Sequence, residues 1–156
     1  MICLTSIRFI LAYACQNDLE LKQVDIKGAY LNGWLDDDDV YMHQPDGFIV
    51  EGKEEFIYKL NKSMYGLKQS GRVLHHTLRS KLQNISFTSG EANMTVFFQI
   101  DNDGLLDIAG WYVDNGLLAA HTAQVMEKMV HDIRGSFEIQ DLGEPSQLLG
   151  MQIICD

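Results

Sequence analysis

Residues 105–120 read Leu-Leu-Asp-Ile-Ala-Gly-Trp-Tyr-Val-Asp-Asn-Gly-Leu-Leu-Ala-Ala, and this stretch indicates the fold most clearly. Two apolar runs, 105–113 and 117–120, have the length of strands and flank Asp114-Asn115. Because Asp, Asn and Gly favour tight turns, the stretch predicts a β-hairpin. A buried strand does not tolerate an unpaired carboxylate, so we expect Asp114 to point outward at the edge of a sheet.

Apolar periodicity on either side of this hairpin predicts three helices and further strands. Helices are expected over 5–17, with Thr5 or Ser6 as the N-cap, over 72–84, and over 122–135, with Thr122 or its neighbour as the N-cap. Strands are expected over 19–26, 40–43, 56–60, 95–100, 137–140 and 147–155, with a turn at 101–104. Because helices alternate with hairpins, we predict an α+β fold in which helices pack on one face of an antiparallel sheet.

Length and composition limit the class of protein. The 156 residues, 46% of them apolar and 22% charged, predict a single domain, 1–156, with an ordinary core. No apolar run approaches the ~18 residues that span a bilayer, so no membrane partner is expected. Cys3, Cys15 and Cys155 lie far apart and form no zinc or disulfide pattern. This use of cysteine favours an intracellular location, in the cytoplasm or nucleus.

The charge is strongly negative overall but unevenly distributed. The net charge is −10, yet residues 59–81 contain six Lys or Arg and no Asp or Glu. Such a window is either an ordinary solvated cationic surface or a phosphate-binding surface. The sequence by itself leaves both interpretations open.

Two carboxylates follow apolar strands at separate places in the chain. Asp25 lies in Gln-Val-Asp-Ile-Lys (23–27), and Asp114 lies in the hairpin turn. Taken singly, Asp25 is a strand-end residue and Asp114 a turn residue. Taken together, two acids at neighbouring strand ends are typical of sites that hold two divalent cations for phosphoryl or nucleotidyl transfer.

Five blocks of the sequence, in order, resemble the reverse transcriptases of copia-type LTR retrotransposons. Residues 63–72, Ser-Met-Tyr-Gly-Leu-Lys-Gln-Ser-Gly-Arg, resemble that family's SLYGLKQSPR segment. Residues 23–33 resemble QMDVKTAFLNG, and residues 40–48 resemble VYMEQPPGF. Residues 112–115 take the place of Tyr-Val-Asp-Asp, and residues 137–151 resemble FEIKDLGE…FLGI. The blocks cover about residues 4–154, so we expect an RNA-directed DNA polymerase domain of a Pol polyprotein.

The resemblance implies a polymerase palm and assigns roles to particular residues. Asp25, Asp114 and the residue at position 115 would be catalytic, and Asp25 and Asp114 would bind Mg²⁺ or Mn²⁺. Tyr30 would exclude a 2′-hydroxyl by its size, although the residues alone favour a core aromatic. Gln69 would contact nucleotide and template, with Lys62, Lys68 and Arg72 on phosphates. The implied partners are an RNA or DNA template-primer and a deoxynucleoside triphosphate. Leu149-Gly150 would lie in a hairpin that grips the primer.

The sequence also departs from the family pattern. Asn115 replaces the second Asp, which removes one negative charge from the metal site. By the resemblance, part of the fingers and the whole thumb would lie outside this chain. We therefore expect impaired nucleotidyl transfer. The alternative is a non-catalytic palm that binds a partner or forms a homo-oligomer through exposed apolar surface.

Overall fold

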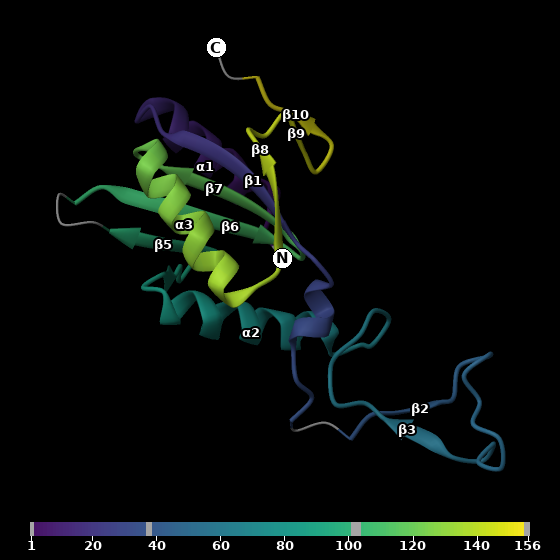
Figure 1. Cartoon of the computed structure of the whole chain (residues 1–156). Helices are drawn as coiled ribbons and strands as arrows, with labels where there is room; N and C mark the ends of the chain where they lie inside the picture. The colour runs from purple at the N-terminus through teal and green to yellow at the C-terminus, as the bar shows by residue number, and fades with distance from the viewer. Residues whose placement is uncertain (1, 37–38, 101–103, 155–156) are drawn as a thin grey trace. The chain divides into compact units, whose positions relative to one another are not determined.

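The structure is a computed structural model that describes residues 2–36, 39–100 and 104–154, and within them the fold is α+β (Figure 1). The helices are α1 (Leu4–Gln16), α2 (Ser70–Asn84) and α3 (Ala123–Ser136), with a 3-10 turn at Ala29–Asn32. Six strands form one antiparallel sheet in the order β4-β5-β6-β7-β1-β8. They are β1 (Glu20–Ile26), β4 (Thr88–Ser89), β5 (Val96–Ile100), β6 (Leu106–Tyr112), β7 (Asn115–Ala120) and β8 (Ile139–Gly143). Two smaller sheets pair β2 (Tyr41–His43) with β3 (Ile57–Lys59), and β9 (Gln147–Leu148) with β10 (Met151–Gln152).

The chain divides into two compact units. One comprises Met1–Ala29 and Leu78–Asp156 and contains the six-stranded sheet. The other comprises Tyr30–Thr77 and contains the β2–β3 hairpin. That the whole chain acts as one palm-like domain remains a prediction.

The predicted central hairpin is confirmed: Tyr112 pairs with Asn115, so only Val113 and Asp114 lie in the turn between β6 and β7. Nearly every residue of these two strands is buried. A strand that is buried on both faces reads as a continuous apolar run and needs cover on both sides. Ile108–Trp111 and Leu117–Ala120 are such runs.

The expectation that helices pack on one face of the sheet is wrong. Ile7 and Ile10 of α1 cluster with Leu117 and Ala119 of β7. Leu118 and Ala120 point to the opposite face, because side chains alternate along a strand, and α3 contacts β7 there. Figure 1 shows α3 in front of the sheet and α1 behind it. Because the apolar run of β7 is continuous, both of its faces need cover, and α1 and α3 provide it.

The helix boundaries agree with the predictions except at two N-termini. The N-cap of α1 is Cys3, because Thr5 and Ser6 already lie inside the helix. The Ser6 hydroxyl instead accepts a hydrogen bond from Asn93, at 2.9 Å. The N-cap of α3 is Thr122, as predicted, and its hydroxyl accepts from the Val125 amide. Helix α2 starts at Ser70, two residues before the predicted start.

The predicted strand over 147–155 is wrong, because the chain turns back in its middle. Leu149 and Gly150 have φ of +48° and +80°, a left-handed geometry that ends β9 and lets β10 pair with it. The hairpin that the resemblance placed at Leu149-Gly150 is therefore present. Cys155 and most of the predicted turn at 101–104 lie outside the described residues.

The second unit contains a hairpin whose loop is held by one side chain. The Gln44 amide donates to the carbonyls of Lys53 and Phe56, and its oxygen accepts from the Val50 amide. These contacts organise the connection between β2 and β3. Across the part of the chain described here, no helix is both long and apolar enough to cross a membrane.

Candidate active site

The β6–β7 turn brings Asp114 beside Asp25 of β1. In the sheet Asp25 lies directly opposite Asn115, the residue after Asp114. The Ile26 amide donates to the Asp114 carbonyl at 2.8 Å, which ties the turn to the end of β1. Both aspartates are half-buried. Two segments distant in sequence therefore present two carboxylates at one end of the first unit's sheet.

The electrostatics of this pair fit a hard divalent cation. Partial burial, and then the negative charge of Asp114, raise the pKa of Asp25. A divalent cation would relieve that repulsion, and carboxylate oxygens are the ligands that Mg²⁺ and Mn²⁺ prefer. No cluster of three or more His, Cys, Asp or Glu able to hold a metal occurs among the described residues. The carboxylate donor set here is thus the pair Asp25 and Asp114.

The turn that carries Asp114 is strained at its first residue. Val113 has φ of +56°, in the left-handed region that a β-branched side chain rarely adopts. A two-residue hairpin turn needs positive φ at its first position, and this position is usually Gly, Asn or Asp. Strain of this kind persists where the surrounding structure enforces it, and it is concentrated at functional sites.

Asn115 is held by side chains on both sides. Its Nδ2 donates to Asp114 Oδ1 at 3.1 Å, and its Oδ1 accepts from Gln23 Nε2 at 3.2 Å. The sequence interpretation gave Gln23 no functional role. The available signal was its spacing: Gln23 is two residues before Asp25, so both side chains lie on the same face of β1.

In the second unit, a hydrogen-bonded loop carries Lys68 and Gln69. The buried hydroxyls of Ser63 and Ser70 are 2.8 Å apart, and Ser70 also donates to the Met64 carbonyl. Gly66, with φ of +90°, makes the bend between these anchors. Tyr30 is half-buried and packs edge-on against the Tyr65 ring, with centroids 4.9 Å apart.

In the basic window 59–81, several cations have partners within the protein. Lys59 forms a 2.6 Å ion pair with Asp39, and this hydrogen-bonded carboxylate raises the pKa of Lys59. Lys62 lies over the Trp34 ring, 5.0 Å from its centroid. Lys81 donates to the Ser136 carbonyl. Lys68, Arg72 and Arg79 are exposed.

The predicted site residues belong to both units. Asp25, Asp114 and Asn115 come together in the first unit. Tyr30, Lys62, Lys68, Gln69 and Arg72 belong to the second. The roles assigned to all of these residues remain predictions.

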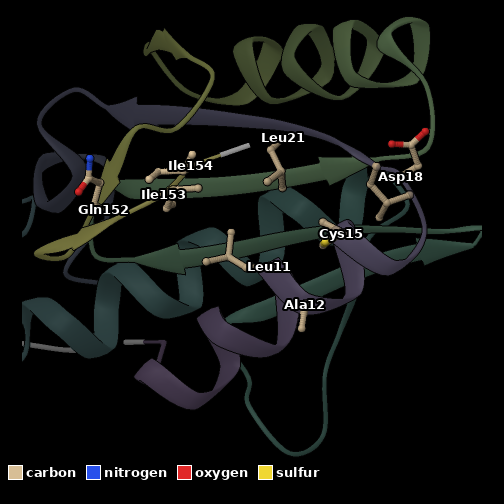
Figure 2. A pocket seen from close by; sticks show the side chains of 10 residues that line it. Leu11, Ala12, Cys15, Asp18, Leu21, Gln152, Ile153 and Ile154 are labelled. Carbon is tan, nitrogen blue, oxygen red and sulfur yellow. The ribbon is translucent and has the colours of Figure 1, made fainter. Parts of the chain in front are cut away.

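A cavity of about 540 Å³ lies elsewhere in the first unit, between α1, the start of β1 and the C-terminal segment (Figure 2). Its lining is mainly apolar, from residues such as Leu11, Leu21 and Ile153, with Asp18 as its one carboxylate. None of the predicted site residues lines it. This cavity lacks paired catalytic groups and is separate from the carboxylate site.

Comparison with known proteins identifies the family. The family model described as reverse transcriptase (RNA-dependent DNA polymerase) matches residues 1–156. The chain therefore belongs to the reverse transcriptase family, and its resemblance to the copia-type members is confirmed.

Individual relatives agree with this family. The chain is 38% identical over 151 residues to the retrovirus-related Pol polyprotein from transposon TNT 1-94 of Nicotiana tabacum. It is 31% identical over 148 residues to that from transposon RE1 of Arabidopsis thaliana. It is 30% identical over 130 residues to a putative transposon Ty5-1 protein of Saccharomyces cerevisiae.

These matches cover most of this chain but only part of each relative. They span 97%, 95% and 83% of the chain, but 11%, 10% and 42% of the respective relatives. The chain thus corresponds to the reverse transcriptase region of much longer Pol polyproteins in the first two cases. No solved structure matches it.

Proposed function

We propose that this chain is the palm of an RNA-directed DNA polymerase whose nucleotidyl-transfer site is centred on Asp25 and Asp114. The observation that supports this most is the approach of these two carboxylates at one end of the sheet, with the pKa of Asp25 raised by burial and by Asp114. A catalytic pair of this kind needs a positive counter-charge, which the family's use of divalent metal would provide.

In this proposal Asp25 and Asp114 hold Mg²⁺ or Mn²⁺, and the other site residues position the substrates. When bound, the cation would neutralise phosphate charge and lower the pKa of the primer hydroxyl. The strained Val113 turn holds Asp114 at a defined place, so little reorganisation accompanies binding. Tyr30, supported by Tyr65, would limit the size of the sugar by steric exclusion.

The second unit would contribute contacts to the nucleic acid. Gln69 and Lys68 sit on the anchored loop, and Arg72 lies in the first turn of α2, so these three would contact nucleotide, template and phosphates. Lys62 would also bind phosphate, and its contact with the Trp34 ring would restrict the motion of its side chain. The partners are then a template-primer and a deoxynucleoside triphosphate, and a cytoplasmic or nuclear location is part of the same proposal.

We further propose that Asn115 reduces this activity. An amide offers one neutral carbonyl oxygen where the family has a carboxylate. Here that oxygen already accepts a hydrogen bond from Gln23. The site therefore has one negative charge fewer with which to hold divalent cations.

Primer extension on an RNA template, with Mg²⁺ or Mn²⁺, tests the proposal on the full chain. We expect weak extension by the natural sequence, at least tenfold stronger extension by Asn115→Asp, and none by Asp25→Ala. The gain corresponds to about 1.4 kcal/mol or more of transition-state stabilisation. Extension that is insensitive to Asp25→Ala would contradict the assignment of the site.

A non-catalytic binding or self-associating palm is the second candidate. The observation that favours it is exposed apolar surface around the β2–β3 hairpin, where Phe48 is 73% and Phe56 64% exposed. Apolar residues gathered in this way commonly mark association surfaces. Analytical ultracentrifugation distinguishes the candidates: Phe48→Ser combined with Phe56→Ser would dissociate an oligomer, whereas a monomer at all concentrations would count against this role.

A further inference from the structure

Two successive hydrogen bonds link Gln23 to Asn115 and Asn115 to Asp114. The chemistry of the groups determines which one donates in each bond. A carboxylate without its proton only accepts hydrogen bonds, so the Asn115 group that faces Asp114 Oδ1 must be the Nδ2 donor, at 3.1 Å. The other end of the same amide, Oδ1, then requires a donor. Gln23 Nε2 supplies one at 3.2 Å.

The sheet register explains why Gln23 reaches Asn115. Asp25 lies directly opposite Asn115 across the β1–β7 ladder, and Gln23 is two residues earlier on β1. Diagonal neighbours on one face of an antiparallel pair are within reach of long side chains. One face of the sheet therefore carries Gln23, Asp25 and Asn115. The hydrogen bonds from Gln23 through Asn115 to Asp114 thus lie next to both carboxylates, those of Asp25 and Asp114.

We propose that Gln23 is a positioning residue of this metal centre: it orients the Asn115 amide, and Asn115 in turn holds Asp114 as a metal ligand. The inference rests on the proposed metal centre at Asp25 and Asp114. Asn115 acts in this arrangement as a donor to Asp114, and its carbonyl oxygen accepts a hydrogen bond from Gln23. Groups that fix the ligands of a metal in this way typically change its affinity 10–100-fold when they are removed.

Mn²⁺ binding to the full chain, followed by electron paramagnetic resonance without nucleic acid, tests the inference. Gln23→Met keeps the approximate size of the side chain but removes the donor, and we expect it to weaken Mn²⁺ binding about tenfold. Asn115→Ala should weaken it by a similar factor. The double variant should be no weaker than Asn115→Ala alone, because Gln23 acts only through Asn115. Gln124→Met, at an exposed position of α3, is the matched control and should leave Mn²⁺ affinity unchanged.

The outcomes separate the inference from the proposed function. If Asp25→Ala abolishes Mn²⁺ binding but Gln23→Met does not weaken it, the positioning role is wrong and the metal centre stands. Additive losses in the double variant would also overturn the positioning role. If Asp25→Ala leaves Mn²⁺ affinity unchanged, the metal centre itself is wrong.

A measurement on the unmodified chain keeps the test independent of variant folding. The Nδ2 protons of Asn115 donate to Asp114, so their exchange with water should be at least tenfold slower than that of exposed Asn84. Side-chain amide resonances in ¹⁵N nuclear magnetic resonance report both rates. Equal exchange at the two residues would contradict a fixed Asn115 amide.

Discussion

At the residue scale, Asp25 combines partial burial with a like charge beside it. Both raise its pKa, so the folded chain binds this proton more tightly than the unfolded chain does. The contribution of this group to the free energy of unfolding is therefore largest at low pH. It falls as the pH rises from the ordinary aspartate value of ~3.9 through the raised pKa in the folded state. A carboxyl group whose raised pKa lowers the stability of the protein at neutral pH is typical of a functional centre.

Asp25→Asn should therefore stabilise the metal-free protein at neutral pH. We expect a gain of about 0.5 kcal/mol, because solvent screens a half-exposed carboxylate. The gain should disappear as the pH is lowered below ~4, where the wild-type carboxyl is also neutral. Urea unfolding at a series of pH values measures both effects. The control is Asp46→Asn, at an exposed position in the second unit. A wild-type chain that is the more stable at pH 7 would contradict the prediction.

At the scale of elements, the β6–β7 hairpin depends on a close approach at Gly116. A Cβ there would lie 2.7 Å from the Trp111 ring and 2.9 Å from Val24 Cγ2. Trp111, which pairs with Gly116 from β6, is buried, and its rigid ring cannot move aside easily. The lack of a side chain at Gly116 thus lets β7 pack between β6 and β1, which sets the position of the adjoining Asp114 turn.

Gly116→Ala should destabilise the protein by about 1–3 kcal/mol, the usual cost of overpacking a core. Gly135→Ala is the matched control, since a Cβ at this α3 position meets nothing within 4 Å. Ala favours a helix over Gly, so that variant should be up to ~1 kcal/mol more stable than the wild type. Thermal unfolding of both variants checks the pair of predictions. Equal effects at the two positions would show that the contact at Gly116 is unimportant.

At the scale of the whole molecule, the charge is −10, which repels nucleic acid except where cations are free to bind it. Half of the chain's Lys and Arg lie in 59–81, and the structure pairs Lys59 with Asp39. Lys68 is exposed on the anchored loop. Cations from the same stretch of sequence should therefore differ in their contribution to binding.

Lys68→Gln should weaken template-primer binding and lower the slope of log affinity against log salt by about 1, the effect of losing one phosphate contact. Lys59→Gln, in which the lost cation was paired with Asp39, should leave the slope unchanged. Fluorescence anisotropy from about 50 to 200 mM salt measures both slopes. Equal losses would mean that the Asp39 pair does not withdraw Lys59 from binding.

Local sequence determined the elements and the residue types of the site. Periodic Leu74, Leu78 and Leu82 predict the buried face of α2, and all three are buried. Thr122 predicts the start of α3, since a hydroxyl satisfies free amides at a helix N-terminus. Asp25, Asp114 and Asn115 are identifiable from their strand-end and turn positions and from the family resemblance, and these signals are local in sequence.

Only the tertiary structure decided which parts lie together and which partners they use. Cover on both faces of β7 depends on α1 and α3, which are far apart in the chain, so no short window indicates it. The reversal at Leu149-Gly150 depends on backbone dihedrals that Leu rarely adopts. The link from Gln23 through Asn115 to Asp114 depends on the β1–β7 register, because hydrogen bonds between strands are set by pairing and not by the sequence of either strand alone.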